Sequence, residues 1–243
     1  MKEFQLTRQQ CTRLCRIVRR YKKHVDLPKS GRKWTNDRLW KKVLGQIVVS
    51  GGARAGYTLA NSVIASHRVS WNRLCRLRNE ANLKKELHLV MRAVGTRYVG
   101  NARIKKGKGN KKVEAAAADF RTLQRCGGPV KFFSKIAKEQ SEDERIKILR
   151  KQLKYYGDKG ARDTLIELGM ARNRIALDSR ILQILKDLGA AVEKTGKRHY
   201  SAIERILIQK IAKPCHVDGA HLDRILFQNY DFIRADLALE GNE

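Results

Sequence analysis

The sequence predicts an all-α protein. Only 3 of its 243 residues are proline, and apolar residues recur every three or four positions along several long segments, which is the spacing of a helix with one buried face. A hydrophobic content of 42% is enough for a core. A chain of this length can form one large domain or two small lobes around a cleft. We therefore expect about a dozen short helices and little or no sheet.

The charge of the chain indicates a polyanionic partner. The sequence has 53 basic and 24 acidic side chains, a formal net charge of +29. The excess is concentrated in residues 1–110, which carry 27 basic and 5 acidic side chains. No fold requires such an imbalance, so we interpret it as the footprint of nucleic-acid binding. A basic RNA- or ribosome-associated protein would explain the charge equally well.

The cysteine and histidine patterns predict neither disulfides nor a metal site. Five cysteines are scattered along the chain, and no apolar run approaches the roughly 18 residues of a membrane span. We expect an intracellular protein, in the cytoplasm or nucleoid, with reduced thiols and no membrane contact. Cys11 and Cys15 share one helical face, which is typical of small buried residues. His216 and His221 form no recognisable ligand set.

Turn and capping residues divide the chain into its predicted helices. The Gly- and Lys-rich segment 100–112 reads as a flexible loop beside phosphates or as a solvated linker. The first helix, 4–25, is basic and amphipathic. The other helices outside the central stretch are expected at 37–48, 53–66, 70–79, 80–94, 112–125, from Pro129 onward, and at 179–189, 199–213 and 219–233.

The central stretch, residues 144–182, contains the most informative pattern. It reads as a helix, a tight hairpin at Tyr156-Gly157-Asp158, and a second helix over 159–169. A loop follows and ends in the apolar run Ile175-Ala176-Leu177. This run places Asp178 at the start of the next helix, where an aspartate caps exposed N–H groups.

These residues resemble the helix-hairpin-helix (HhH-GPD) DNA glycosylase superfamily. The pattern Gly157-x-Lys159-x-Ala161, with Asp178 19 residues after the lysine, is most similar to the 8-oxoguanine DNA glycosylase/AP lyase branch. Three further segments resemble the family: residues 39–54, residues 94–98, and Leu222-Asp223 with Phe227. The resemblance implies the helix-hairpin-helix glycosylase fold, two helical lobes around a cleft.

The resemblance also sets the expected domain boundaries. It covers residues 38–235, so we expect a glycosylase-like domain over 36–235, with its hairpin motif at about 145–180. Residues 1–35 are then an added basic helical extension, and residues 236–243 are a tail. Some relatives hold an iron–sulfur cluster with four cysteines near the C-terminus. Only Cys215 lies there in this chain, so we expect no cofactor.

The resemblance implies a catalytic role for Lys159 and Asp178. The lysine amine would attack C1′ of a flipped-out nucleotide, displace the base and leave a Schiff base, after which β-elimination would nick the strand. The carboxylate would stabilise the positively charged sugar and move protons. Alone, such a lysine is usually a phosphate contact, and such an aspartate is usually a plain helix cap.

Further residues are candidates for DNA contact. Backbone N–H groups of the hairpin and the following helix N-terminus can bind a phosphate, and glycine allows close approach of the backbone. The expected DNA contacts are Tyr156, Gly157, Asp158, Gly160, Arg54, Gly51, Gly52 and Arg180. The candidates for the base pocket are Asp223, Phe227 and Tyr230, with Phe232 nearby, although aromatic residues at helical spacing are more often core.

The chain departs from the family pattern at two places. Tyr155 occupies the first glycine of the family's Gly-x-Gly hairpin, which predicts weaker phosphate binding. Gly51-Gly52 stands where relatives often carry an asparagine that fills the space left by the flipped base, and Arg54 could take over that role.

The predicted function is a DNA glycosylase with AP-lyase activity that acts as a monomer on double-stranded DNA containing a modified base. By family, the base is 8-oxoguanine and the process is base excision repair. A bulky base, such as glucosylated hydroxymethylcytosine of phage DNA, would instead indicate antiviral defence. A non-catalytic helix-hairpin-helix DNA-binding protein is the alternative from another class.

Overall fold

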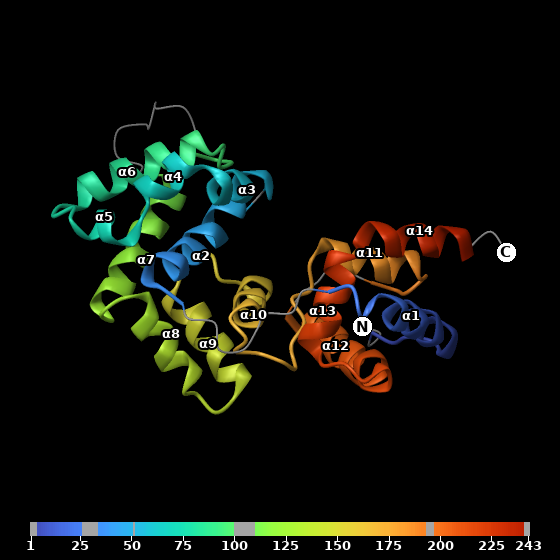
Figure 1. Ribbon diagram of the computed structural model, residues 1–243. Helices are drawn as coiled ribbons and strands as arrows, with labels where there is room; N and C mark the ends of the chain where they lie inside the picture. The colour runs from blue at the N-terminus through green and yellow to red at the C-terminus, as the bar shows by residue number, and fades with distance from the viewer. Residues whose placement is uncertain (1–3, 26–33, 51, 100–109, 193–196, 241–243) are drawn as a thin grey trace. The chain divides into compact units, whose positions relative to one another are not determined.

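The structure, a computed structural model, describes residues 4–25, 34–50, 52–99, 110–192 and 197–240. The described residues form helices joined by turns and contain no strand (Figure 1), which confirms the predicted all-α class. Helix α12 continues into a π-helical segment, η1, and a 3₁₀ turn, η2. In chain order the elements are α1 (Arg8–Tyr21), α2 (Asn36–Val49), α3 (Arg54–Asn61), α4 (Val63–Arg68), α5 (Trp71–Cys75), α6 (Glu80–Ala93), α7 (Lys111–Arg125), α8 (Pro129–Ala137), α9 (Glu142–Gln152), α10 (Asp158–Glu167), α11 (Ser179–Asp187), α12 (Lys197–Leu207), η1 (Ile208–Ala212), η2 (Lys213–Cys215), α13 (Gly219–Gln228) and α14 (Tyr230–Glu240).

Two predicted helices are each divided in two. The predicted helix 53–66 breaks at Ser62, whose hydroxyl accepts a hydrogen bond from the Ala65 N–H and caps α4. The predicted helix 219–233 breaks at Asn229, whose side-chain amide donates to the Ile225 carbonyl at the end of α13. Both breaks coincide with local capping hydrogen bonds, which the spacing of apolar residues does not reveal. The predicted loop at 100–112 lies mostly outside the described residues.

The chain forms two compact units. Residues 1–30 and 158–243 form the terminal unit, which contains α1 and α10–α14, and residues 31–157 form the middle unit, which contains α2–α9. The sequence analysis treated residues 1–35 as an added extension. In the structure, α1 lies within the terminal unit and shares its core.

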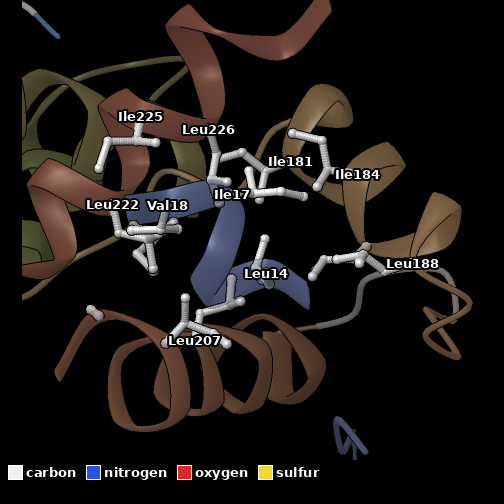
Figure 2. Close-up of a cluster of buried hydrophobic side chains, with 14 of the residues drawn as sticks. Leu14, Ile17, Val18, Ile181, Ile184, Leu188, Leu207, Leu222, Ile225 and Leu226 are labelled. Atoms are coloured by element: carbon white, nitrogen blue, oxygen red, sulfur yellow. The ribbon is translucent and has the colours of Figure 1, made fainter. Parts of the chain in front are cut away.

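The core of the terminal unit surrounds α1. Figure 2 shows Leu14, Ile17 and Val18 of α1 among apolar side chains of α11, α12 and α13. All three α1 side chains are at most 2% exposed. Burial of a side chain of this size stabilises a fold by about 1.5–3 kcal/mol. The first helix is therefore an integral part of this unit.

The core of the middle unit is built on three aromatic rings. Trp40 of α2 packs edge-on against Phe120 of α7, with ring centroids 5.2 Å apart, and Trp71 of α5 lies 4.7 Å from the same phenylalanine. The Trp40 indole N–H donates to the Val69 carbonyl at 2.9 Å. This bond satisfies the polar atom of a fully buried ring, as buried tryptophans require.

A buried carboxylate in the middle unit fixes the turn after α9. Asp119 of α7 is fully buried, and its two oxygens accept hydrogen bonds from the Lys154 backbone N–H at 2.8 and 3.1 Å. Burial raises the pKa of Asp119 to about 7, although the Lys154 N–H and charge favour the ionised form. The hairpin is thus tied to α7 by a group that titrates near neutrality.

We predict that Asp119 makes the protein less stable as pH rises from about 4 to about 7. A carboxyl with a higher pKa in the folded state than in the unfolded state binds its proton more tightly when folded. Its stabilising contribution is therefore complete below pH 4 and is lost by about pH 7, a change on the order of a few kcal/mol. Asp119→Asn should flatten this part of the pH dependence in urea unfolding.

Asp231→Asn, which removes an exposed carboxylate on α14, is the matched control. Equal pH profiles for wild type and Asp119→Asn would show that the Asp119 carboxyl does not titrate in this range.

Candidate functional site

The predicted hairpin lies between α9 and α10, and its left-handed residue is Tyr155. The Tyr155 φ is 59°, while Gly157 lies outside the left-handed region. The sequence analysis assigned the backbone freedom of this turn to Gly157, and the structure places the strained conformation two residues earlier. A left-handed conformation costs an L-residue roughly 1–2 kcal/mol. Tyr155 is 41% exposed, so its side chain only partly offsets this cost by packing.

At the hairpin, backbone groups are more accessible to a ligand than side chains are. The Tyr156 ring is buried and Gly160 is buried within α10, while Gly157 is exposed. A Cβ placed on Gly157 would meet nothing within 4 Å, so the backbone is open to approach at this point. The Asp158 carboxylate, at the first position of α10, lies 3.4 Å from Arg162 Nη1.

Lys159 is the second residue of α10 and is held by an acidic partner. Its ammonium donates to Asp163 Oδ2 at 3.2 Å, one helical turn later, and the side chain is 43% exposed. The other oxygen of Asp163 accepts a hydrogen bond from Arg224 Nη2 of α13 at 3.0 Å. Asp163 therefore fixes the lysine to α10 and, through Arg224, to α13.

Asp178 caps α11, as the sequence predicts. Its Oδ1 accepts hydrogen bonds from the Arg180 and Ile181 N–H groups, both at 3.0 Å. These two donors belong to the helix N-terminus, where the first N–H groups have no partner within the helix. The carboxylate is therefore kept in a fixed orientation at the start of α11.

Three buried side chains bind the three residues before Asp178. Glu204 accepts from the Ile175 N–H at 3.0 Å, Asp223 accepts from the Ala176 N–H at 2.7 Å, and the Tyr200 hydroxyl accepts from the Leu177 N–H at 2.7 Å. The same hydroxyl donates to the Ile175 carbonyl at 2.9 Å. The strand-like run 175–177 thus has its backbone satisfied by side chains of α12 and α13.

A buried ion pair connects α10 to this loop. Arg162 and Glu204 form two hydrogen bonds, at 2.9 and 3.0 Å, and their side chains are 6% and 4% exposed. The Arg162 guanidinium also lies over the Tyr200 ring, 4.5 Å from its centroid. Burial raises the pKa of the Tyr200 hydroxyl far above its usual range, so Tyr200 stays neutral and keeps its proton for the Ile175 carbonyl.

A chain of polar contacts runs from Lys159 to the loop that precedes Asp178. The chain of contacts runs from Lys159 through Asp163 to Arg224, whose Nε lies 3.6 Å from Asp223 Oδ2. Burial is the main cause that raises the pKa of Asp223 to about 7; the negative charges of Asp163 and Asp178 act in the same direction, while Arg224 and the Ala176 N–H act in the opposite direction. Asp223, which also accepts from the Ala176 N–H, thus links the contacts of Lys159 to the loop that leads into Asp178.

The predicted pocket residues lie in different surroundings. Asp223 is 2% exposed and its carboxylate holds the 175–177 loop. The half-buried Phe227 ring lies beneath the half-buried Arg180, 4.7 Å from the guanidinium carbon, and Tyr230 is 5.8 Å from the same group. Phe232 is 66% exposed. The structure thus groups Arg180, Phe227 and Tyr230 on α11, α13 and α14, next to the cap of α11.

The remaining predicted DNA contacts belong to the middle unit. Arg54 is exposed at the first position of α3. Gly52 is half-buried, and a Cβ there would lie 3.2 Å from the flexible Arg97 side chain. Gly51 lies outside the described residues. The structure therefore leaves an exposed arginine at this turn, as the sequence suggested.

Sequence reasoning missed five residues of these contacts: Arg162, Asp163, Tyr200, Glu204 and Arg224. Asp163 could have been found, because it lies four residues after Lys159, the spacing of helical neighbours. Nothing in the local sequence marks Tyr200, Glu204 and Arg224, since they reach the loop and α10 from 23 to 61 residues away.

Neither a metal-binding cluster nor a membrane-spanning helix occurs in the described ranges. No group of three or more histidine, cysteine, aspartate or glutamate side chains there could hold a metal ion. No helix in those ranges is long and apolar enough to cross a membrane.

Comparison with known proteins assigns the fold. No protein-family model and no curated protein matches the sequence. Among solved structures, 8-oxoguanine DNA glycosylase of Methanocaldococcus jannaschii is 17% identical, with a TM-score of 0.60 over 89% of this chain and 91% of that chain. The glycosylase/lyase of that organism in complex with 15mer DNA containing 8-oxoguanine has a TM-score of 0.56, at 17% identity over 89% and 87% of the chains. The Thermotoga maritima 8-oxoguanine DNA glycosylase has a TM-score of 0.60, at 19% identity over 89% and 93%.

The chain therefore has a helical DNA glycosylase fold. More particularly, it is the fold of the archaeal and bacterial 8-oxoguanine DNA glycosylases. The resemblance inferred from the residues of the hairpin is confirmed at the level of fold.

We predict that Tyr155→Gly stabilises the protein by about 0.5–1 kcal/mol. Glycine removes the cost of the left-handed conformation, about 1–2 kcal/mol. Part of this gain is lost, because glycine also raises the conformational entropy of the unfolded chain and so stabilises the unfolded state. Tyr155→Ala is the matched control, because alanine keeps the Cβ and the strain but removes the ring. Urea unfolding of both variants measures the difference. A glycine variant no more stable than the alanine variant would show that Tyr155 is unstrained.

Proposed function

We propose that the protein is a DNA glycosylase with AP-lyase activity, and that 8-oxoguanine is the first base to test as its substrate. The observation that carries the proposal is the pair of Lys159 and Asp178. The polar contacts of Lys159 lead through Asp163, Arg224 and Asp223 to the loop that precedes Asp178, within a fold shared with 8-oxoguanine DNA glycosylases. The net charge of +29 supports a polyanionic substrate.

Lys159 acts as the nucleophile. Its unprotonated amine forms a bond to C1′ of the flipped-out nucleotide as the C1′–N bond breaks, and the bonding electrons leave with the base, which takes up a proton. The sugar ring then opens to give a Schiff base between Nζ and C1′. Loss of a C2′ proton expels the 3′ phosphate by β-elimination. Asp163, 3.2 Å from Nζ, is placed to accept the proton that the ammonium must lose.

Asp178 stabilises the transition state. Positive charge develops on the sugar as the base leaves, and a fixed carboxylate offsets that charge without having to reorganise. The cap geometry supplies this fixation, because two N–H groups hold Oδ1 at 3.0 Å. The same carboxylate is suited to moving protons during ring opening and elimination.

We assign the DNA contacts to accessible groups of both units. The open backbone at Gly157 and the N-terminus of α10 bind a phosphate. Arg180 contributes a cation, and the Phe227 and Tyr230 rings beside it offer apolar faces to a flipped base. Arg54 of the middle unit is a further phosphate contact or fills the space that the flipped base leaves. The partner is double-stranded DNA, bound by a monomer.

We expect borohydride to trap a covalent adduct between the wild-type protein and duplex DNA containing 8-oxoguanine. Parallel duplexes carry an abasic site, uracil, or glucosylated hydroxymethylcytosine, so the panel also tests the bulky-base alternative. Lys159→Gln should abolish trapping and lower base release by about 10³-fold or more. Asp178→Asn should lower base release by about 10²–10⁴-fold.

Lys151→Gln, which removes an exposed lysine in the last turn of α9, controls for the loss of one charge near the hairpin. Base release without an adduct would leave a glycosylase in which Lys159 only binds DNA. Binding of every duplex without release of any base would replace the proposal with a non-catalytic helix-hairpin-helix DNA-binding protein.

A further inference from the structure

The first helix carries an exposed row of positive charge. Arg16, Arg19 and Arg20 of α1, with Lys23 just after it, are exposed and follow one another at helical spacings of three and four residues. We call these four residues the basic stripe. Residues 8–24 contain no acidic side chain. Like charges at such spacings destabilise a helix, so folding alone does not account for the stripe.

The orientation of the stripe is fixed by the core. Leu14, Ile17 and Val18 hold the apolar face of α1 among α11, α12 and α13 (Figure 2). Arg20 is held further by Asp236, with Nη1 and Oδ2 2.6 Å apart. Because this packing prevents α1 from rotating about its own axis, its charged face stays on the surface of the terminal unit.

Two lysines of a neighbouring segment extend this surface. Lys210 of η1 and Lys213 of η2 are exposed, and both segments pack against α1. The Cys15 thiol donates to the Lys210 carbonyl at 3.9 Å, and the Cys215 thiol donates to the Cys15 carbonyl at 3.7 Å. Among the residues that the structure describes, no carboxylate forms an ion pair with Arg19, Lys23 or these two lysines.

We propose that the basic stripe is a second DNA-binding surface, which contacts phosphates of duplex DNA away from the hairpin. This inference extends the proposed function, since the same duplex would be held by the hairpin and by α1. Each phosphate contact releases counterions, so affinity should fall with salt by a logarithmic slope of about 0.9 per contact. Arginine and lysine on an exposed helix face suit such sequence-independent contacts.

The test is the salt dependence of binding to an undamaged DNA duplex, measured by fluorescence anisotropy. Arg19→Gln/Lys23→Gln should lower the slope of log K against log salt by about 1.8, at an unchanged single-turnover rate of base release on saturating damaged DNA. The matched control is Lys135→Gln/Lys138→Gln, which removes two exposed lysines at the end of α8 and should change the slope much less.

An unchanged slope, or an equal fall in the control, would overturn the proposal, as would a loss confined to duplex RNA or to vesicles of anionic lipid. If the wild type releases no base but the two double variants differ in slope as expected, the DNA surface stands and the proposed catalysis fails. The two ideas are therefore tested separately.

A different observation carries a second inference, which also rests on the proposed function. The Tyr200 hydroxyl binds both the Leu177 N–H just before Asp178 and the Ile175 carbonyl. These two hydrogen bonds, made by a buried side chain, join the two ends of the run 175–177. They fix the backbone that leads into Asp178, the cap of α11. We infer that Tyr200 is a positioning residue for Asp178.

Tyr200→Phe isolates this role. Phenylalanine keeps the ring beneath Arg162 and removes only the hydroxyl, so the Leu177 N–H and the Ile175 carbonyl lose their partner. We expect the single-turnover rate of base release to fall about 10-fold with KM unchanged, because a small displacement of the carboxylate weakens transition-state stabilisation. In the Asp178→Asn background, Tyr200→Phe should have no further effect.

Ile184→Val is the control for lost stability. It removes a methyl group from the same core without touching the loop, and it should leave the rate unchanged. A 10-fold loss that persists in the Asp178→Asn background, or that Ile184→Val reproduces, would show that Tyr200 is merely structural. If Asp178→Asn itself retains the wild-type rate, the failure lies in the proposed role of Asp178.

Discussion

The arrangement of the site depends on three consecutive backbone N–H groups, those of Ile175, Ala176 and Leu177. They are buried outside any helix or sheet, and an unsatisfied buried donor costs about 1–3 kcal/mol. Glu204 and Tyr200 of α12 and Asp223 of α13 supply the acceptors. The loop can therefore take only the path that meets all three side chains, and that path fixes where α11 begins and where its capping carboxylate lies.

The same acceptors extend into ionic contacts with α10. Glu204 accepts two hydrogen bonds from Arg162, while Arg224 and Asp163 join α13 to Lys159. A buried ion pair is no reliable source of stability, because the cost of removing charges from water is comparable with their attraction. Its consequence here is geometric: removal of either partner would leave a buried charge, so helices α10, α12 and α13 have to keep one registry. The contacts of Lys159 are thereby linked to the loop that ends at the Asp178 carboxylate.

The first helix combines two demands that act on opposite faces. The apolar face, with Leu14, Ile17 and Val18, is required by the core of the terminal unit. The exposed face, with Arg19 and Lys23, contributes nothing to that core and repels itself. A residue pattern that folding does not need is a reason to look for a partner, and the partner that suits positive charge at fixed helical spacing is the phosphate backbone of DNA.

The sequence by itself determined the features that depend on neighbouring residues. Helical spacing gave the all-α class, the hairpin pattern singled out Lys159, and a local cap placed Asp178 at the start of α11. The left-handed turn at Tyr155 and the helix break at Asn229 were not predictable, because single capping bonds and packing decide them. Only the tertiary structure showed that Glu204, Asp223 and Tyr200 bind the loop. These hydrogen bonds join residues 23 to 47 positions apart, and contacts over such separations produce no periodic pattern in the sequence. The chemistry-bearing residues are thus encoded locally, and their alignment comes from buried polar groups that only folding brings together.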